Sequence, residues 1–581
     1  MKKFCAKIIS AIFLAVTMFT PLKVQAVDAW AIAAQGLGVY AMYRSALSSI
    51  LAMGNDVHAQ MTAKRQDKKE NGVDENPHDV ELVDKIMTRL VNNSEYELRV
   101  NSLPFIWSVN DSEKFNAACY PMNYITVNKG LLRIMDGDED AVAAVLAHEM
   151  THGIEQHSAK NYAQAIAQSA GATLLAMQVD NRHVDWAKLS GMVGYSIAKN
   201  INLPAEHEAD RGGFYLMTSA GFNPGGGAAA MARMDYYLRY ETNDFLEYNP
   251  HDKPNEQTMS DHPDAEVREE NLSKMMTDYS MGHVMVEKVN RSYKVFIDGE
   301  EIYTAEIPGA TYKSAMKAYY FAGGLAKAFH DYTSADAWNF RQGNVGDIEF
   351  LTDDKIFDDL REISFSLNIG AKIRDAVTRA YENESAEVRQ KYFEDETARK
   401  DSWEKIKAES LTANKNLAKK LRINADAYND FGRGDLALIE IERALAAENQ
   451  DDVAECFAVR GRAKAIIGDY DGALADADTA VKMDSSNLFN YLNRADVRHM
   501  RGEMDAALAD IELALAIDPK KAVSYQLQGD IYDEMGDVDK ALESYRRCYE
   551  LAKKNPRSVP KEYLEKIDPD AAEKLRKNKK S

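Results

Sequence analysis

Cysteine is scarce in this chain: there are four in 581 residues, and one of them, Cys5, lies within the first seven residues. The other three, Cys119, Cys456 and Cys548, lie far apart, so at most one disulfide bond can form among them. A small exported scaffold held by disulfide bonds needs paired cysteines at tight spacing. The scarcity therefore excludes a disulfide-based fold, and the lack of any CxxC pattern excludes a cysteine zinc finger.

Basic residues are in the minority, since 71 Lys and Arg are set against 92 Asp and Glu, a formal net charge of -21. This balance argues against nucleic acid or an anionic membrane surface as the main partner, and it leaves peripheral contact with a membrane open. The hydrophobic fraction of 45% is ordinary for a globular protein, which excludes a collagen, a coiled-coil rod and wholesale disorder. At this length we expect about two to four domains.

The N-terminus also lacks an apolar run long enough to span a membrane. Three lysines within the first seven residues precede an apolar run from Ile8 to Phe19, which is short for a membrane span. Val24-Gln25-Ala26 then supplies the small residues that precede a signal-peptidase cut. We therefore predict a cleaved signal peptide at residues 1–26 and export, with the periplasm or cell envelope favoured and secretion as an alternative. The competing interpretation is an N-terminal membrane anchor, because further apolar residues follow.

Residues 27–77 are predicted to form an N-terminal helical segment and a polar loop from Ala63 to Pro77. In the next part, apolar residues at helical spacing predict helices at Val80–Val91 and from Ala141 to about His157, and Asp138 is the expected N-cap of the second helix. Short apolar runs bounded by turn residues predict strands at Leu98–Val100, Phe105–Val109 and Tyr124–Val127. Together these elements place an α+β domain at residues 78–280.

Residues 281–410 form a middle α+β module of unknown role. Three short strand-like runs lie at Val284–Val289, Tyr293–Ile297 and Ile302–Ile307. Asp298-Gly299, which separates two of them, is a strong hairpin signal. A helix is expected from Tyr312 to Phe329. A packing or spacer role is the default interpretation.

Residues 411–581 are repetitive and end in a basic tail. Gly468, Gly502 and Gly536 are spaced by 34 residues, and an Ala-Leu pair follows each glycine at the same distance. Gly434 extends the period backwards to a looser repeat. This period is typical of tetratricopeptide repeats, an α-solenoid of two antiparallel helices per unit. Its groove is expected to bind a protein partner or client.

The residues most suggestive of chemistry are His148-Glu149-Met150-Thr151-His152. Histidines four apart on a helix project from one face, and neutral imidazoles suit Zn²⁺. Glu149 beside them can take a proton from water at the metal. The apolar residues before His148 predict a buried helix, where such polar groups are costly unless a metal or partners satisfy them. An incidental His and Glu on a surface helix is the alternative.

Catalytic zinc usually keeps three protein ligands, so a third is needed. The segment from Leu203 to Asp210 predicts a second helix on which Glu206 and Asp210 share a face. We propose Glu206 as ligand and Asp210 as acceptor of a hydrogen bond from the far nitrogen of a ligand histidine. His207 and Glu208 are rival ligands, and a solvated acidic face is the alternative without a metal.

These motifs resemble the gluzincin metallopeptidases in which HExxH is followed by ExxxD, a family that includes the CAAX prenyl proteases, HtpX, mitochondrial Oma and BepA. The resemblance covers roughly residues 78 to 275. It also includes a downstream His-Pro with an arginine five residues later, matched by His262-Pro263 and Arg268. The resemblance implies that His262 either occupies a fourth zinc position in a latent state or stabilises the transition-state oxyanion, and that Arg268 supports the ligands.

Two departures from the family pattern stand out. The glycine pair that the family often carries in its edge-strand segment is replaced here by Met122-Asn123, which affects the substrate cleft rather than the zinc site. The block from Met281 to Lys405 also separates protease and repeats more widely than in BepA-like proteins, although their order is the same.

The sequence thus predicts an exported zinc metalloendopeptidase with one Zn²⁺ per chain, acting on proteins or peptides in envelope quality control. Glu149 would act as the general base, and an extended substrate would pair with the strand near Tyr124–Val127 as an added edge. The alternative is a non-catalytic repeat adaptor or chaperone with a latent protease domain. A zinc hydrolase of non-peptide bonds is a third reading without a sequence feature of its own.

Overall fold

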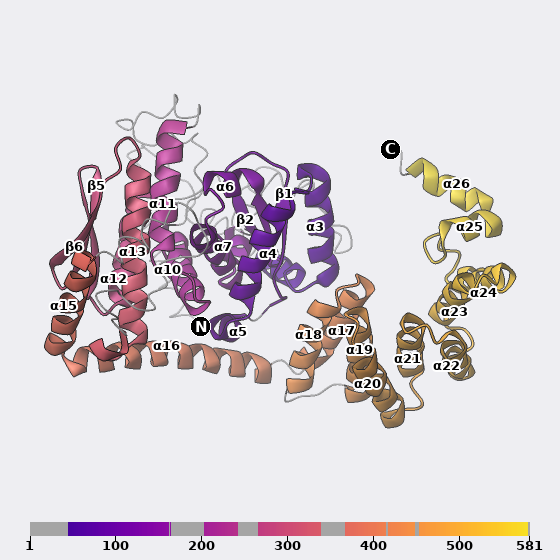
Figure 1. Cartoon of the computed structure of the whole chain (residues 1–581). Coiled ribbons are helices and arrows are strands. Elements are labelled where there is room, and N and C mark those ends of the chain that lie inside the picture. Colours follow the sequence, from indigo (N-terminus) through magenta and orange to yellow (C-terminus); the bar gives the residue numbers. More distant parts are fainter. Residues whose placement is uncertain are drawn as a thin grey trace, which may run out of the picture. The chain divides into compact units, whose positions relative to one another are not determined.

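The computed structural model describes residues 44–161, 163, 203–241, 265–338, 367–447 and 452–578, apart from residue 101 and residues 414–415. These residues are mostly helical, with two three-stranded sheets and a C-terminal series of helices (Figure 1), which confirms the predicted α+β, predominantly helical fold. The chain divides into two compact units, Met1–Trp403 and Glu404–Ser581. Within the described ranges, no helix is long and apolar enough to cross a bilayer. The predicted signal peptide at residues 1–26 lies outside them.

The first sheet consists of β1 (Ile106–Asn110), β2 (Ala117–Tyr120) and β3 (Tyr124–Asn128), in the order β1-β3-β2. The strands predicted near 105–109 and 124–127 are therefore confirmed. However, β3 pairs with β1 on one side and with β2 on the other. The prediction that a substrate adds beside Tyr124–Val127 is wrong, because the backbone groups of a central strand already serve its two neighbours. β1 and β2 are the two edge strands, and β2 is the one that packs against α7 (Glu139–Ile154).

The helices before this sheet correct two predictions. The segment expected to be a loop from Ala63 lies largely in α3 (Val57–Asn71), because Asp56 caps the helix and a buried face of the helix contacts the sheet. On that face Gln60 Nε2 donates hydrogen bonds to the carbonyl oxygens of Pro104 and Met122, at 2.9 Å and 2.8 Å.

The strand expected at Leu98–Val100 is wrong as well. Residues 94–99 form α5 (Ser94–Arg99), whose first turn is capped by the Asn93 side chain. This short helix follows α4 (Pro77–Val91), the helix predicted at Val80–Val91. A three-residue apolar alternation is too short a signal to compete with an N-cap and a buried Tyr96.

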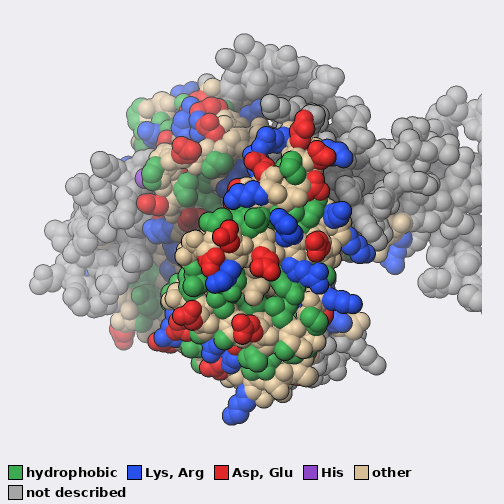
Figure 2. Space-filling model, turned by 90° about the vertical axis from the view of Figure 1, so that its right-hand side faces the viewer, with side chains coloured by type: hydrophobic (Ala, Val, Ile, Leu, Met, Phe, Trp, Pro, Cys, Tyr) green, Lys and Arg blue, Asp and Glu red, His purple; other side chains and the backbone are tan. Residues whose placement is uncertain are grey.

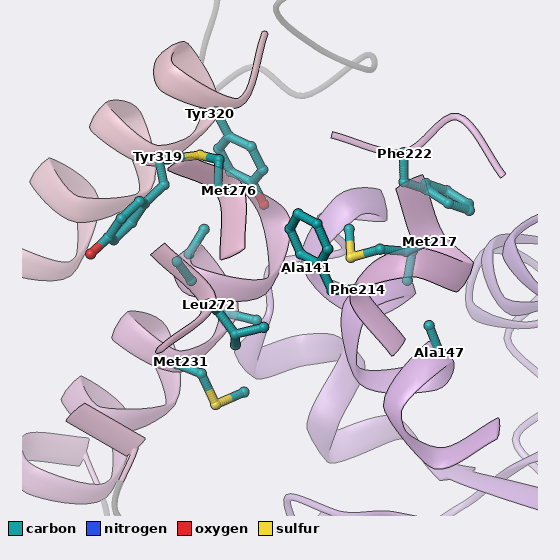
Figure 3. Packing of buried hydrophobic residues seen from close by; sticks show 14 of the residues in the cluster. Ala141, Ala147, Phe214, Met217, Phe222, Met231, Leu272, Met276, Tyr319 and Tyr320 are labelled. Atoms are coloured by element: carbon teal, nitrogen blue, oxygen red, sulfur yellow. The ribbon is translucent and has the colours of Figure 1, made fainter. Parts of the chain in front are cut away.

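The centre of the first unit is α7 (Glu139–Ile154), which begins at the predicted N-cap: Asp138 Oδ1 accepts a hydrogen bond from the Ala141 backbone N–H at 2.9 Å. The apolar N-terminal half of α7 is buried against α4, α10 (Leu203–Ser219) and α11 (Gly226–Tyr236), and the same core continues from α11 to α12 (Ala265–Tyr279) and α13 (Thr311–Asp331). In Figure 3 Phe214 and Met217 of α10 lie beside the α7 alanines, and Leu272 and Met276 of α12 fill the space toward α13. Burial of this helix fixes the direction in which its histidines point.

The second sheet is antiparallel and consists of β4 (Val284–Val289), β5 (Ser292–Ile297) and β6 (Glu300–Ala305), with the predicted hairpin at Asp298-Gly299. Both turn residues have positive φ, 46° and 82°, as a tight hairpin requires. Helix α13 covers this sheet and corresponds to the helix predicted at 312–329. The hydrophobic core runs without a break from α7 through α13 to α15 (Leu367–Asn383), so these middle elements are packed on the same core as the candidate site.

Helix α16 (Ala386–Ala413) leads from the first unit into the second. The second unit then consists of helical hairpins, which confirms the predicted tetratricopeptide repeats. The helices are α17 (Leu417–Asp430), α18 (Gly434–Ala446), α19 (Val453–Ile466), α20 (Tyr470–Met483), α21 (Leu488–Met500), α22 (Met504–Ile517), α23 (Ala522–Glu534) and α24 (Val538–Leu551), followed by α25 (Lys561–Ile567) and α26 (Pro569–Asn578).

The glycines that set the repeat period lie in the turns between paired helices. Gly468, Gly502 and Gly536 have φ of 91°, 86° and 79°, and their surroundings are open, so backbone conformation rather than space selects glycine there. On the face of the molecule shown in Figure 2, acidic and basic side chains are interspersed with hydrophobic ones. On that face the negative net charge is therefore spread rather than gathered into one acidic field.

Candidate metal centre

Three side chains from two helices converge in the first unit. His148 and His152 lie one turn apart on α7, and their Nε2 atoms are 3.1 Å from each other. Glu206 of α10 places Oε2 at 3.5 Å from His148 Nε2 and Oε1 at 3.4 Å from His152 Nε2. All three residues are buried, and one ligand atom of each lies within 4.8 Å of the others. Two imidazole nitrogens and one carboxylate fit a catalytic zinc, which keeps a fourth position open.

Glycines allow the two helices to approach closely enough for this convergence. A Cβ on Gly213 of α10 would lie 2.8 Å from the His148 backbone nitrogen, and one on Gly212 would lie 2.5 Å from Thr151 Cγ2. Similarly, a Cβ on Gly153 would lie 2.8 Å from Cys119 Sγ. The glycine after the second histidine therefore lets α7 sit directly on β2.

The other face of His148 is held by two charged residues. Asp210 Oδ1 lies 2.9 Å from His148 Nδ1, and Arg268 of α12 donates to Asp210 from Nη2 at 2.6 Å and from Nε at 3.0 Å. Burial alone would raise the pKa of Asp210, but hydrogen bonding to His148 and the charge of Arg268 hold that pKa well below its usual range. Asp210 is therefore a carboxylate that accepts the Nδ1–H of His148, so Nε2 faces Glu206 and would offer its lone pair to a metal bound there.

The charge around His148 also favours a cation. Burial and Arg268 lower the pKa of His148, but its hydrogen bonds to Asp210 and Glu206 outweigh them and raise that pKa from 6.5 to about 9. Two carboxylates thus draw positive charge into a buried place. A divalent ion would supply that charge in the position where the three ligand atoms meet.

Glu149 is the neighbour of the first ligand and is also buried. Its Oε2 accepts a hydrogen bond from the backbone N–H of Cys119 on β2, at 3.1 Å. Burial, with the nearby charge of Glu149, raises the pKa of the Cys119 thiol well above its usual value, so this cysteine stays protonated. The carboxylate of Glu149 is therefore positioned by the edge strand of the sheet.

One further residue at the site, His157, was not singled out from the sequence. His157 Nδ1 lies 3.1 Å from His152 Nδ1, and Glu208 Oε2 lies 3.0 Å from His157 Nε2. Glu208, one of the rival ligands, thus contacts His157, and the other rival, His207, is exposed. The signal available in the sequence was a third histidine five residues after the second. The predicted residue His262 lies outside the described residues.

Fold and site together define a helical metallopeptidase-like domain followed by helical repeats. Comparison with known families agrees: residues 77–276 match Peptidase family M48, and residues 487–554 match a tetratricopeptide repeat family. The chain therefore carries an M48 peptidase domain and C-terminal tetratricopeptide repeats, which confirms the resemblance recognised in its motifs.

Two curated proteins resemble parts of this chain. The mitochondrial metalloendopeptidase OMA1 of Schizosaccharomyces pombe is 35% identical over 125 residues, which are 21% of this chain and 34% of that protein. A putative beta-barrel assembly-enhancing protease of Vibrio cholerae is 25% identical over 170 residues, 27% of this chain and 34% of that protein. The chain thus spans about a third of the length of each of these two relatives.

Solved structures resemble the chain over about a quarter of its length. A crystal structure of MamA is 23% identical, covers 25% of this chain and 83% of its own, and has a TM-score of 0.20. TTC0263, a thermophilic tetratricopeptide repeat protein of Thermus thermophilus, is 22% identical, and the match covers 27% of this chain and 86% of that protein with a TM-score of 0.23. At these TM-scores neither structure bears on the role of the repeats.

Proposed function

We propose that this chain is a zinc metalloendopeptidase that hydrolyses peptide bonds in protein substrates. The observation that carries the proposal is the buried convergence of His148, His152 and Glu206, with the carboxylate of Glu149 beside it. The match to an M48 peptidase domain supports the same class of chemistry. One Zn²⁺ would be held by the three residues, with Asp210 and Arg268 fixing the ring of His148.

A zinc ion bound there would supply Lewis acidity, polarising the scissile carbonyl and lowering the pKa of a water molecule. Glu149 would accept a proton from the attacking water and pass it to the leaving amine as the C–N bond breaks. The N–H of Cys119 holds the Glu149 carboxylate toward the sheet, which keeps the base on the side of the edge strand. For His262, the sequence-based proposal stands: it either closes the site in a latent state or stabilises the oxyanion.

An extended substrate would add beside β2, the edge strand of the first sheet that packs against α7. Among the described strands β2 pairs with β3 alone, and its outer side at Cys119 faces Glu149. Ser158 Oγ donates to the Cys119 carbonyl oxygen at 2.8 Å, so a substrate strand would replace this hydrogen bond with one of its own. Pairing there would bring a scissile peptide next to the general base.

The same proposal includes export and a role for the repeats. The signal-peptide pattern at residues 1–26 supports the periplasm or cell envelope, with secretion as the alternative. The tetratricopeptide helices would recruit a protein client or partner, and misassembled envelope proteins are the client class that fits this order of domains. Quality control of envelope proteins is thus the proposed setting for the protease.

Cleavage of casein by the full chain tests the activity. Glu149→Gln should lower the rate by about 10²–10⁴-fold, the usual contribution of a general base, while the zinc content stays at the wild-type level because Glu149 is not a ligand. Glu113→Gln removes an exposed carboxylate, 61% accessible, and should cleave normally.

Equal cleavage by Glu149→Gln and wild type would contradict the proposal. If, in addition, a chain lacking the repeats lost its function in the cell, the interpretation as a non-catalytic adaptor would replace the protease proposal. A wild-type protein that binds zinc but cleaves no peptide would instead indicate a hydrolase of other bonds.

A further inference from the structure

His157 lies just beyond the end of α7, at a place where the chain reverses. Helix α7 ends at Ile154, and Gln156 then adopts a left-handed conformation with φ of 58°. This turn brings His157 back against the helix, where its side chain is only 4% exposed. Its ring crosses that of His152 edge-to-face, with ring centres 5.1 Å apart. The turn therefore places a buried imidazole behind a candidate metal ligand.

The contacts of His157 form a chain that ends at the protein surface. His152 Nε2 faces His148 and Glu206, while its Nδ1 lies 3.1 Å from His157 Nδ1. His157 Nε2 in turn lies 3.0 Å from Glu208 Oε2, and that carboxylate is 57% exposed. His157 itself is not a candidate ligand, because its contact is with the Nδ1 of His152 and not with the side that faces Glu206.

Hydrogen-bond chemistry fixes the direction of this chain once a metal binds. A ligand imidazole offers its Nε2 lone pair to the metal, so the proton of His152 must be on Nδ1. His152 then donates to His157 Nδ1, which must be unprotonated, and His157 carries its own proton on Nε2 and donates it to Glu208. Each of the three groups has one role, and no donor faces a donor.

We propose that His157 is a positioning residue that selects the metal-binding tautomer of His152 and holds its ring, with Glu208 fixing the tautomer of His157 in turn. The proposal rests on the proposed function of the same site. It assigns to His152 the kind of support that Asp210 gives His148 directly at 2.9 Å. Asp210 and Glu208, the carboxylates at the end of the two supports, both lie on α10, which also carries Glu206.

Substitutions at position 157 can separate hydrogen bonding from packing. The Oδ1 of an asparagine lies near the place of histidine Nδ1 and can accept from His152, whereas the amide nitrogen of a glutamine lies near Nε2 and can only serve Glu208. His157→Phe fills the space without either group. The experiment measures the zinc dissociation constant of the full chain by competition with a chromophoric chelator, together with thermal unfolding in excess chelator and casein cleavage.

We expect His157→Phe and His157→Gln to bind zinc about 10–100-fold more weakly than wild type, and His157→Asn to recover much of that loss. Glu208→Ala should weaken binding less, because water can replace an exposed acceptor, and Glu208→Gln less again, because its amide oxygen still accepts. His78→Phe, at an exposed histidine on α4, is the matched control and should bind zinc like wild type.

Equal zinc affinity in wild type, His157→Phe and His157→Gln would overturn the proposal, as would an asparagine variant no better than the glutamine variant. If His157→Phe fails to unfold cooperatively in chelator, two other comparisons of zinc affinity decide instead. They are His157→Asn against His157→Gln, and Glu208→Ala against wild type. Equal zinc affinity within either pair would then overturn the proposal. The proposed function fails separately: a wild-type chain that binds zinc with this dependence on His157 yet cleaves no casein keeps the positioning role and loses the protease.

Discussion

The close approach of α7 and α10 should be sensitive to a single methyl group at Gly213. A Cβ there would lie 2.8 Å from the His148 backbone nitrogen and 2.9 Å from its Cα, where 3.4–4 Å is ordinary contact. Both atoms belong to a buried helix backbone that cannot rotate away. Gly213→Ala must therefore push α10 from α7 by about 0.6 Å, and Glu206 moves with it.

The expected magnitudes follow from opposing effects. Overpacking of a core costs about 1–3 kcal/mol, and replacing glycine by alanine inside a helix returns up to ~1 kcal/mol, so the free energy of unfolding should fall by about 0–3 kcal/mol. Zinc binding should suffer more clearly, by ~10-fold, because a metal site tolerates only about 0.5 Å of misplacement.

Urea unfolding in excess chelator and zinc competition measure the two effects of Gly213→Ala separately. Gly227→Ala on α11 is the matched control, since its added Cβ meets only the flexible side chain of Leu272 at 3.2 Å. That variant should keep both stability and zinc affinity. If Gly213→Ala bound zinc as tightly as Gly227→Ala, the claim that glycine packing sets the ligand geometry would be refuted.

Three other predictions concern charges at or near the site. Arg268→Leu leaves the buried carboxylate of Asp210 without its guanidinium, so urea unfolding in chelator should show a loss of about 3–5 kcal/mol; a loss below ~1 kcal/mol would contradict this role. Asp140 is buried, and burial, only partly offset by the Asn223 N–H, raises its pKa from 3.8 to about 6. A raised carboxyl pKa means that the wild type loses stability as pH rises through that window, so Asp140→Asn should gain up to ~3 kcal/mol relative to wild type between about pH 4 and about pH 7 and nothing below it; parallel pH profiles of stability would rule this out. Zinc at about 100 times its dissociation constant should stabilise the folded chain by ~2.7 kcal/mol, and Glu206→Ala should abolish most of that gain in a thermal-shift assay; an undiminished shift would show that the ion binds elsewhere.

Much of the fold could be predicted because the signals were periodic or local. The 34-residue spacing of the glycines specified the repeats, and the Asp298-Gly299 turn specified a hairpin, because both depend on backbone conformations that few residues adopt. Helix α7 was equally clear, since Asp138 caps a long apolar run. In each case neighbouring residues determine the structure.

The errors arose where distant contacts decide. The charged segment from Ala63 was predicted to be a loop, yet Lys64 Nζ donates to the Trp107 carbonyl oxygen at 2.8 Å and Asp67 Oδ1 accepts from Asn110 Nδ2 at 3.2 Å, contacts that no local pattern reveals. The edge of the first sheet was wrongly assigned to Tyr124–Val127, which is the central strand. Strand order depends on pairing between segments, so neither segment alone reveals it.

The site shows the same division. His148, His152 and Glu206 were proposed together because spacing of four on one helix, and a second acidic helix, restrict the geometry strongly. His157 was passed over, since its approach to His152 depends on the left-handed turn at Gln156, a conformation that sequence does not signal at a glutamine.

Zinc-edge anomalous diffraction from crystals of the full chain tests the central claim most directly. We predict one strong peak per chain, about 2.0–2.2 Å from His148 Nε2, His152 Nε2 and a carboxylate oxygen of Glu206. A crystal grown with zinc that shows no peak among these three side chains, or a peak held by other residues, would contradict it.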